Sequence, residues 1–325
     1  ATRTVATSFQ SDFAWFKQRD AATGHLLYNT ITGGTNSLVS NTTAAEAQHG
    51  DAVLTFNSAD IQIAGTDTGG LNGDTNSMVL WNWKAGGAAS TIAAGSIDGT
   101  NPTIASSVSA NPTAGFSIVS YTGNATAGAT VGHGLSSAPD MIILKDRDAI
   151  NSWRVYSSEI PNTQHLILND TNALVTGTHW NNTTATSSVF SLGSNDAVNG
   201  ARGFIAYCFH SIEGYSKVGS YEGNGNADGS FIYLGFKPEF FLVKDIDAVE
   251  SWAMWDGTRE PYNKLSKKLS PNSPVAEYTA NTTTYAIDFL SNGVKLRSSY
   301  SVLNASQTYI YYAIAKSPFK TSNAR

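Results

Sequence analysis

A phrase of ten residues is written three times in this chain. Each copy has an acidic residue, four apolar residues, a lysine and, three positions after the lysine, an aspartate. The copies are Asp12–Ala21, Asp140–Ala149 and Glu239–Ala248. A chain made of copies of one unit is usually an array or a scaffold, so the repeat constrains the fold before any functional site is considered.

The residues that follow each copy also match. The position eight residues after the lysine holds His25, Trp153 or Trp252. Each unit closes on an apolar run, and the three runs are Ser77–Trp83, Gly203–Phe209 and Thr308–Ile314. An Asn/Thr cluster precedes each run, at 41–43, 181–184 and 281–284. Because the period of about 100 residues exceeds the ~20–50 of solenoid repeats, we predict three tandem domains instead of one superhelix.

The repeat sets the predicted domain boundaries. Residues 1–84 form the first β repeat, abbreviated at its N-terminus, and residues 85–114 form a linker with an extra strand. Residues 115–213 form the second β repeat, and residues 214–325 form the third.

The starts of the units differ more than their ends. The second and third units begin with a lead-in hairpin, at Gly115–Asn124 and Gly214–Asn224. The first unit has only Arg3–Val5 in that place, so we expect a segment upstream of Ala1. Between the first two units, Ala85–Thr91 has the composition of a flexible linker, whereas Thr103–Ser109 alternates like a strand.

The local pattern predicts β-strands along the whole chain. Runs such as Met141–Leu144 and Phe240–Val243 are short and β-branched or aromatic. Residues Ile287–Leu296 alternate around Asn292-Gly293, which is a strong hairpin signal. The unbroken apolar runs before the lysines predict burial on both faces. The sequence therefore predicts an all-β fold of three tandem, related antiparallel β-sandwich domains, with helical candidates only at 41–48 and 263–269.

The composition argues against a nucleic-acid partner and against membrane insertion. Charged residues make up 14 % of the chain, against about 25 % in typical soluble proteins, and the net charge is −5. We therefore expect no nucleic-acid partner, which would need clustered Lys and Arg. We also expect no membrane insertion, because no apolar stretch approaches the ~18 residues of a span. The single cysteine, Cys208, is interpreted as a small buried residue and not as a reactive thiol.

Catalytic and metal sites are not indicated. The six histidines lack zinc-ligand spacing, and turn chemistry explains the acidic, Gly-rich loops at 67–74 and 222–228 without calcium, although calcium stays open as an alternative. Asp20, Asp148 and Asp247 recur in one context, so we interpret them as turn-capping residues, paired with the nearby lysines, instead of general acids. We predict no catalytic residue, no metal and no cofactor. Paired carboxylates for glycan cleavage stay an alternative.

Aromatic and amide side chains suggest a binding site. Trp180 lies in a polar stretch between His179 and Asn181. An exposed indole face that meets sugar C–H groups, with amides that bind hydroxyls, is a common glycan platform. We therefore predict possible glycan binding by Trp180, Asn181 and His179. The alternative is that Trp180 packs under its own loop, as Trp81, Trp83, Trp153, Trp252 and Trp255 are expected to pack in the core.

Several longer phrases resemble a known repeat domain. They are the triplicated phrase, residues 41–46, Trp81–Gly87, Gly115–Gly123 with Val131–Leu135, and Ser317–Lys320. Together they are similar to a domain of tail-fibre-like virion structural proteins of cyanobacterial and other marine tailed phages. The resemblance covers nearly the whole chain and implies no catalytic residues.

The resemblance implies a function and a location. A phage virion structural protein is expected, most simply a tail-fibre or other fibre-like appendage subunit that forms a homo-oligomer, with a trimer expected, and touches other virion proteins and a host surface glycan. It would be part of the virion and extracellular when assembled. The alternatives are a carbohydrate-binding lectin-like module and a glycan-degrading tail spike. Recognition is expected where the copies differ, at 62–73, 178–184 and 263–274.

Overall fold

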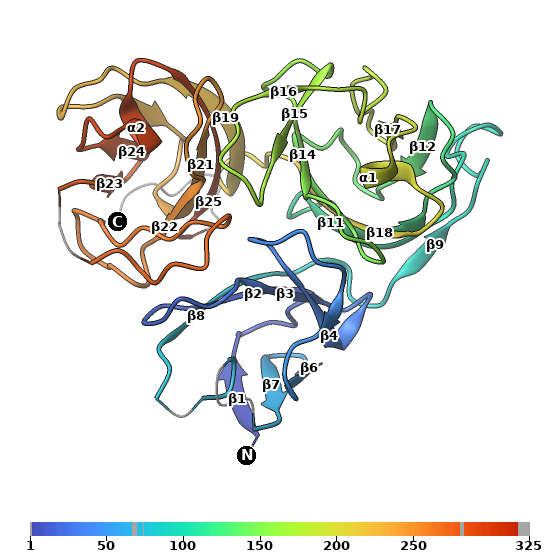
Figure 1. Cartoon of the computed structure of the whole chain (residues 1–325), viewed down its shortest axis with the longest axis horizontal. Helices are drawn as coiled ribbons and strands as arrows, with labels where there is room; N and C mark the ends of the chain where they lie inside the picture. The colour runs from blue at the N-terminus through green and yellow to red at the C-terminus, as the bar shows by residue number, and fades with distance from the viewer. Residues whose placement is uncertain (1, 67–69, 74, 280–282, 318–325) are drawn as a thin grey trace.

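The computed structural model describes residues 2–66, 70–73, 75–279 and 283–317 (Figure 1). Parts of three sequence features lie outside these residues: the loop 67–74, the Asn/Thr cluster 281–284 and the ending 317–320. Within the described residues, strands dominate, all paired strands are antiparallel, and the helices α1 (Asp196–Asn199) and α2 (Ser301–Asn304) have four residues each. The predicted all-β fold of antiparallel sheets is therefore confirmed.

The first unit contains two sheets. The larger has the order β5-β4-β3-β2-β8 and the smaller has the order β1-β7-β6. Their strands are β1 (Arg3–Ala6), β2 (Phe13–Gln18), β3 (Leu26–Asn29), β4 (Gly33–Val39), β5 (Ala47–Gln48), β6 (Val53–Phe56), β7 (Asp60–Ala64) and β8 (Met78–Trp83). The lysine lies on β2 and the closing strand is β8, as the repeat predicts.

The second unit has a larger sheet because strands from 85–114 join it. The order is β16-β15-β14-β13-β18-β11-β10-β9, opposite a two-stranded sheet of β12 and β17. The strands are β9 (Ser90–Ile92), β10 (Ser106–Asn111), β11 (Phe116–Thr122), β12 (Ala129–Gly132), β13 (Met141–Asp146), β14 (Arg154–Ser157), β15 (Gln164–Ile167), β16 (Val175–Thr176), β17 (Val189–Leu192) and β18 (Gly203–Phe209). The extra strand expected in 103–109 is present as β10.

The third unit repeats this plan in shorter form. A sheet of order β19-β25-β21-β22 faces one of order β20-β24-β23. The strands are β19 (Ser216–Glu222), β20 (Phe231–Tyr233), β21 (Pro238–Asp245), β22 (Ala253–Asp256), β23 (Ile287–Leu290), β24 (Gly293–Leu296) and β25 (Thr308–Ala315). The hairpin expected around Asn292-Gly293 is confirmed as β23–β24.

The lysine strands are buried on both faces, as their unbroken apolar runs predict. Alternate residues of a strand point to opposite faces. In the first unit, Ala14 and Phe16 pack against the small sheet of that unit, whereas Phe13 and Trp15 point the other way. The second face does not pack on a sheet of the same unit. It belongs to a cluster that the three units share.

The shared cluster holds the units together as one body. Each unit contributes the same face of its lysine strand and closing strand: Phe13, Trp15, Trp81 and Trp83 from the first, Met141, Ile143, Ile205 and Tyr207 from the second, and Phe240, Leu242, Ile310 and Tyr312 from the third. Figure 1 shows the units as three lobes that meet at the centre. The boundaries at 84, 114 and 213 stay predictions, but the units are not separated like beads on a string.

Three finer expectations are wrong. The lead-in hairpins do not form, because β11 pairs with β10 and β18, whereas β12 pairs with β17. The segments 41–48 and 263–269 are not helical. The supposed flexible linker is held in place at Ala85, which is 2 % exposed and donates its N–H to Asp12 Oδ2 at 2.7 Å.

Candidate functional site

The three repeated lysines connect neighbouring units. Each is fully buried, and its ammonium donates to the carbonyl of the next residue in its own strand. Each also donates to a carbonyl of another unit: Lys145 to Thr43 at 3.2 Å, Lys244 to Thr171 at 3.3 Å and Lys17 to Pro274 at 3.1 Å. The second unit thus holds the first, the third holds the second, and the first holds the third. The contacts close a ring with three seams.

Burial lowers the pKa of these three lysines, but they stay protonated at pH 7. Desolvation lowers the pKa of Lys17, Lys145 and Lys244 to about 8 in each case, partly offset by nearby carboxylates such as Asp20 or Asp146. An ammonium has three N–H donors, which suits it to bind several carbonyls at once. The lysines therefore act as positively charged clasps.

The repeated aspartates fix the start of each closing strand. Each carboxylate accepts the backbone N–H at that point: Asp20 from Ser77 at 2.9 Å, Asp148 from Gly203 at 2.6 Å and Asp247 from Thr308 at 2.8 Å. These bonds tie the turn after each lysine strand to the closing strand. The interpretation as framework residues is supported, although the partner in these hydrogen bonds is the backbone and not the lysine.

The predicted glycan platform has a different environment. Trp180 is 1 % exposed and packs edge-on against Tyr156 at a centroid distance of 5.5 Å. His179 is 7 % exposed and lies against His165, whereas Asn181 is half-buried in the turn that follows. An exposed indole at Trp180 is therefore wrong, because a ring enclosed in the core offers no face to a sugar. Trp180 packs under its own loop.

The remaining sequence candidates are also structural. Trp81, Trp83, Trp153, Trp252 and Trp255 are buried, as expected. Cys208 is buried, and desolvation raises the pKa of its thiol to about 12, so the interpretation as a small core residue is confirmed. Residues 263–274 are not a free loop, because Leu265 and Leu269 are buried in the third unit and Pro274 receives the Lys17 clasp.

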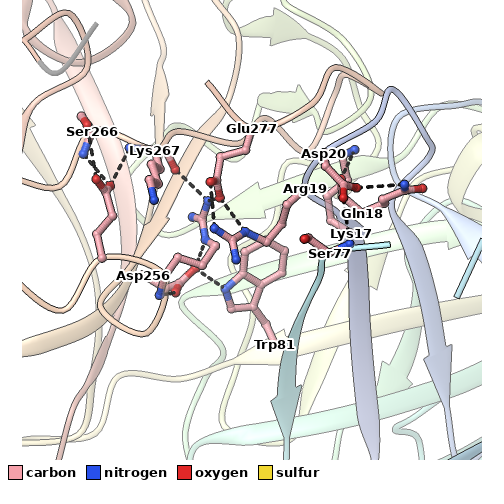
Figure 2. A network of polar contacts seen from close by, with 12 residues as sticks. Lys17, Gln18, Arg19, Asp20, Ser77, Trp81, Asp256, Ser266, Lys267 and Glu277 are labelled. Carbon is pink, nitrogen blue, oxygen red and sulfur yellow. Dashed lines mark hydrogen bonds and ion pairs between the residues drawn. The ribbon is translucent and has the colours of Figure 1, made fainter. Parts of the chain in front are cut away.

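The seam between the first and third units contains a network of charges in which Asp256, Arg259 and Glu277 are buried and Arg19 is partly exposed (Figure 2). Arg19 donates two hydrogen bonds to Glu277, both at 2.9 Å. Arg259 donates to the same carboxylate at 2.7 Å and to Asp256 with its Nε. Trp81 Nε1 donates to Asp256 Oδ2 at 3.1 Å. Two guanidinium groups thus balance two carboxylates, and the network connects β8 to the third unit.

Hydrogen bonds set the ionisation of this network. Burial acts to raise the pKa of Glu277, but the hydrogen bonds from Arg19 and Arg259 outweigh it and lower the pKa below its ordinary value. The Arg259 guanidinium also lies 5.6 Å from the centre of the Trp81 ring, within the range of a cation–π contact.

A groove of about 690 Å³ lies beside this network. One wall is β8 along its whole length, from Met78 to Trp83. The opposite wall comes from the third unit and includes Phe240, Arg259 and Ile314. Its walls therefore combine apolar side chains with the polar groups of the seam.

The groove and its network were not predicted from the sequence. Asp256 and Arg259 are only three residues apart, but Glu277 lies 18 positions from Arg259 and 258 from Arg19, so the sequence does not bring the network together. One signal could have located the groove: among the described residues, the first unit has no counterpart of β11 or β19 beside its closing strand. What the arrangement offers is a long apolar cleft along a strand edge, which suits binding of a chain better than chemistry on a small substrate.

No group of three or more His, Cys, Asp or Glu residues in the described part of the chain could hold a metal ion. No helix of that part of the chain has the length and apolar character to cross a membrane.

Comparisons with known proteins give one match. No curated protein and no solved structure matches the chain significantly. A family model does match, from residue 1 to residue 318, and its description is a domain of unknown function. Because the model covers nearly the whole length, the chain belongs to the DUF7483 family.

Proposed function

We propose that this protein is a structural subunit of a phage virion, in a tail fibre or another fibre-like appendage. The first support is the resemblance of the triplicated phrase and the other repeated segments to tail-fibre-like virion proteins. The second is physical: the polar residues that recur in all three units hold the fold together. The repeated lysines and aspartates bind backbone groups of the chain itself. Such internal bonding suits a structural subunit that must stay folded outside a cell.

The observation that carries the proposal is the ring of lysine clasps. Each clasp joins a buried ammonium to a neighbouring unit, and the third closes the ring. Such closure buries both faces of every lysine strand, so none of these three strands is left with an exposed apolar face. In this proposal the chain forms a homo-oligomer, with a trimer the expected state, and contacts other virion proteins and the host surface.

Purified particles of the phage that encodes the chain test the proposal. Mass spectrometry of the particles should detect the protein, and antibody-gold labelling in electron micrographs should place it on an appendage. Particles that lack the protein while infected cells contain it would refute a virion role. Light scattering of the purified protein measures its oligomeric state independently.

A second candidate function is a lectin-like module. It depended on an exposed Trp180, and Trp180 is enclosed in the core. No other described residue favours glycan binding specifically, and the enzyme alternative has no observation in its favour.

A further inference from the structure

Three basic side chains of the second unit lie in contact with one another. Arg154 belongs to β14, His165 to the neighbouring β15, and His179 to the loop that follows β16. Arg154 Nη1 lies 3.3 Å from His165 Nε2, and the ring centroids of His165 and His179 are 3.9 Å apart. Val155 and Leu166 point into the shared cluster, so Arg154 and His165 point to the opposite face of the sheet. The three side chains therefore meet inside the second unit, away from the seams.

No carboxylate pairs with Arg154 among the described residues. Five other arginines each form an ion pair with an Asp or a Glu: Arg19, Arg147, Arg202, Arg259 and Arg297. At Arg154, burial lowers the pKa of the guanidinium and no carboxylate acts to raise it. A positive charge that is removed from water without a partner is costly. The cluster therefore carries a charge that the described part of the chain does not neutralise.

The nitrogens of the cluster that lack partners are mostly hydrogen-bond donors. A guanidinium only donates, so His165 Nε2 must accept from Arg154, and the proton of the neutral ring lies on Nδ1. In the described structure, His165 Nδ1 is buried without a hydrogen-bond partner, as are Arg154 Nε and both ring nitrogens of His179. One nitrogen of a neutral His179 also carries a proton. Three N–H groups and one positive charge therefore require an acceptor, which a cation cannot supply.

The other two units have no such cluster. One hydrogen bond recurs in all three and gives the register: an Asn side chain accepts the backbone N–H eight residues after the lysine. The positions of Arg154 and His165 are taken by Leu26 and Ser37 in the first unit and by Ala253 and Lys268 in the third. Lys268 has partners of its own, Ser270 at 2.7 Å and the ring of Tyr285 at 4.7 Å. The repeated framework therefore does not require the cluster.

The cluster lies just below the surface. Arg154 is half-buried, His179 is 7 % exposed, and Thr176 and Thr178 of the same loop are exposed. Gly177, between them, lies against His179, and a Cβ at this position would be 2.8 Å from His179 Nδ1. The ring is therefore covered at this point by backbone alone, and a small solute has a short path to it.

We propose that Arg154, His165 and His179 bind a small anion whose oxygens only accept hydrogen bonds, such as sulfate, phosphate or a carboxylate. The anion neutralises the guanidinium and accepts the N–H groups that lack partners. Hydrogen bonds between charged groups of this kind are stronger than those between neutral groups. The bound anion also joins the loop that holds His179 to β14 and β15. The site is independent of whether the protein belongs to a virion.

Sulfate, titrated into the whole chain at constant ionic strength by isothermal calorimetry, tests the site. Direct binding is the readout, because sulfate also stabilises proteins in general through exclusion from their surfaces. We expect one saturable site per chain. A separate titration with acetate shows, by the tighter of the two anions, whether the site prefers a sulfate or phosphate group or a carboxylate.

The pH dependence of sulfate binding is a second readout. Sulfate stays a dianion between about pH 7.5 and 5.5, where histidines change charge, so a change in affinity comes from the protein. Among the described residues, the groups that act electrostatically on the two rings are Arg154 and the rings themselves. Affinity should rise as the pH falls, because each ring that takes up a proton adds a donor and a positive charge.

Arg154→Met and Lys237→Met form a matched pair, because each removes one positive charge. Arg154→Met should weaken sulfate binding at least about tenfold, the scale of one lost hydrogen bond to a charged group. Lys237 is exposed and belongs to the third unit, so Lys237→Met should bind like the wild type. Crystals of the wild-type protein grown in sulfate should show the anion within hydrogen-bond distance of Arg154 and His165, a result that no misfolded variant can affect.

Three results would overturn the proposal. One is the absence of saturable binding of either anion. Another is equal weakening by Arg154→Met and Lys237→Met, which would indicate attraction to the overall charge of the protein. The third is a water molecule alone between the three side chains in the sulfate-grown crystals.

Discussion

The ammonium of Lys17 donates a hydrogen bond to the carbonyl of Pro274, a residue 257 positions away in the sequence. This bond joins the first unit to the third and completes a circle that Lys145 and Lys244 continue between consecutive units. The free energy that holds the units together therefore includes equivalent contacts at each of the three seams.

Replacement of Lys145 by Met should destabilise the protein. The methylene stem is retained, but the carbonyls of Thr43, Asp146 and Ala149 lose a donor. Buried acceptors without partners cost about 1–3 kcal/mol, so the free energy of unfolding in urea should fall by that order. Lys237→Met, at an exposed lysine, is the matched control and should change little. Equal effects of the two substitutions would argue against the clasp.

Glu277→Gln should be more damaging. The substitution removes the charge that Arg19 and Arg259 share at the seam of the first and third units. Arg259 keeps Asp256 as a partner, but two guanidinium groups then share one carboxylate, and breaking a buried ion pair costs up to about 3–5 kcal/mol. Glu46→Gln is a useful comparison because Glu46 holds a single arginine, Arg147, whose side chain is 25 % exposed. Thermal unfolding should show the larger fall in Tm for Glu277→Gln, and the opposite order would contradict the assigned network.

The His165–His179 pair predicts acid sensitivity. Burial lowers the pKa of His165 to about 3 and that of His179 to about 4, against an ordinary 6.5. Above pH 6.5 both are neutral in either state, and stability is full. As the pH falls below 6.5, the unfolded chain binds protons that the folded chain rejects, so stability falls down to about pH 4 for His179 and pH 3 for His165. His179→Gln should flatten the decline of Tm between pH 6.5 and 4. An unchanged decline would rule out this histidine as its source.

Trp180→Ala separates a core role from a sugar platform. Removal of a buried indole leaves a cavity and should lower the unfolding free energy by about 3–5 kcal/mol. Thr184→Ala, in the exposed part of the same loop, should change it by less than about 0.5 kcal/mol. A glycan array with Trp180→Phe, which retains most of the packing, should match the wild type. A stable Trp180→Ala protein that loses glycan binding would restore the platform interpretation.

Residues 115–213 expressed alone should not give a well-packed domain. In the whole chain, Ile143 and Tyr207 point into the shared cluster, where they meet side chains of the other units. In isolation this face would be exposed to water. We expect weak near-UV circular dichroism and binding of a hydrophobic dye. A fragment with cooperative unfolding at the Tm of the whole chain would support independent tandem domains instead.

Local patterns were enough to predict the strands. The runs before Lys145 and Lys244 are short, apolar and rich in β-branched or aromatic residues, and the structure places them on β13 and β21. Burial on both faces also followed from their unbroken apolar character. What covers the second face could not be predicted, because that depends on how the three units meet and not on the sequence within one unit.

Loop interpretations failed where backbone geometry overrides composition. Trp180 has polar neighbours, which suggested exposure. Asn181 and Asn182 both adopt positive φ, 52° and 51°, a conformation that Asn tolerates better than most residues. The resulting turn brings the indole back under the loop. The partners of Arg19 and Lys17 could not be predicted from the sequence either, because Glu277 and Pro274 lie more than 250 positions away.

Closure of the ring also fixes the number of copies. In an open repeat array, a further unit adds at one end and leaves the existing interfaces as they are. Here each unit has a neighbour on both sides, so a fourth copy would have to change the angle between every pair. Duplication or loss of one repeat, which lengthens or shortens solenoid proteins, would therefore break this one. Its copies are free to diverge in sequence but not in number.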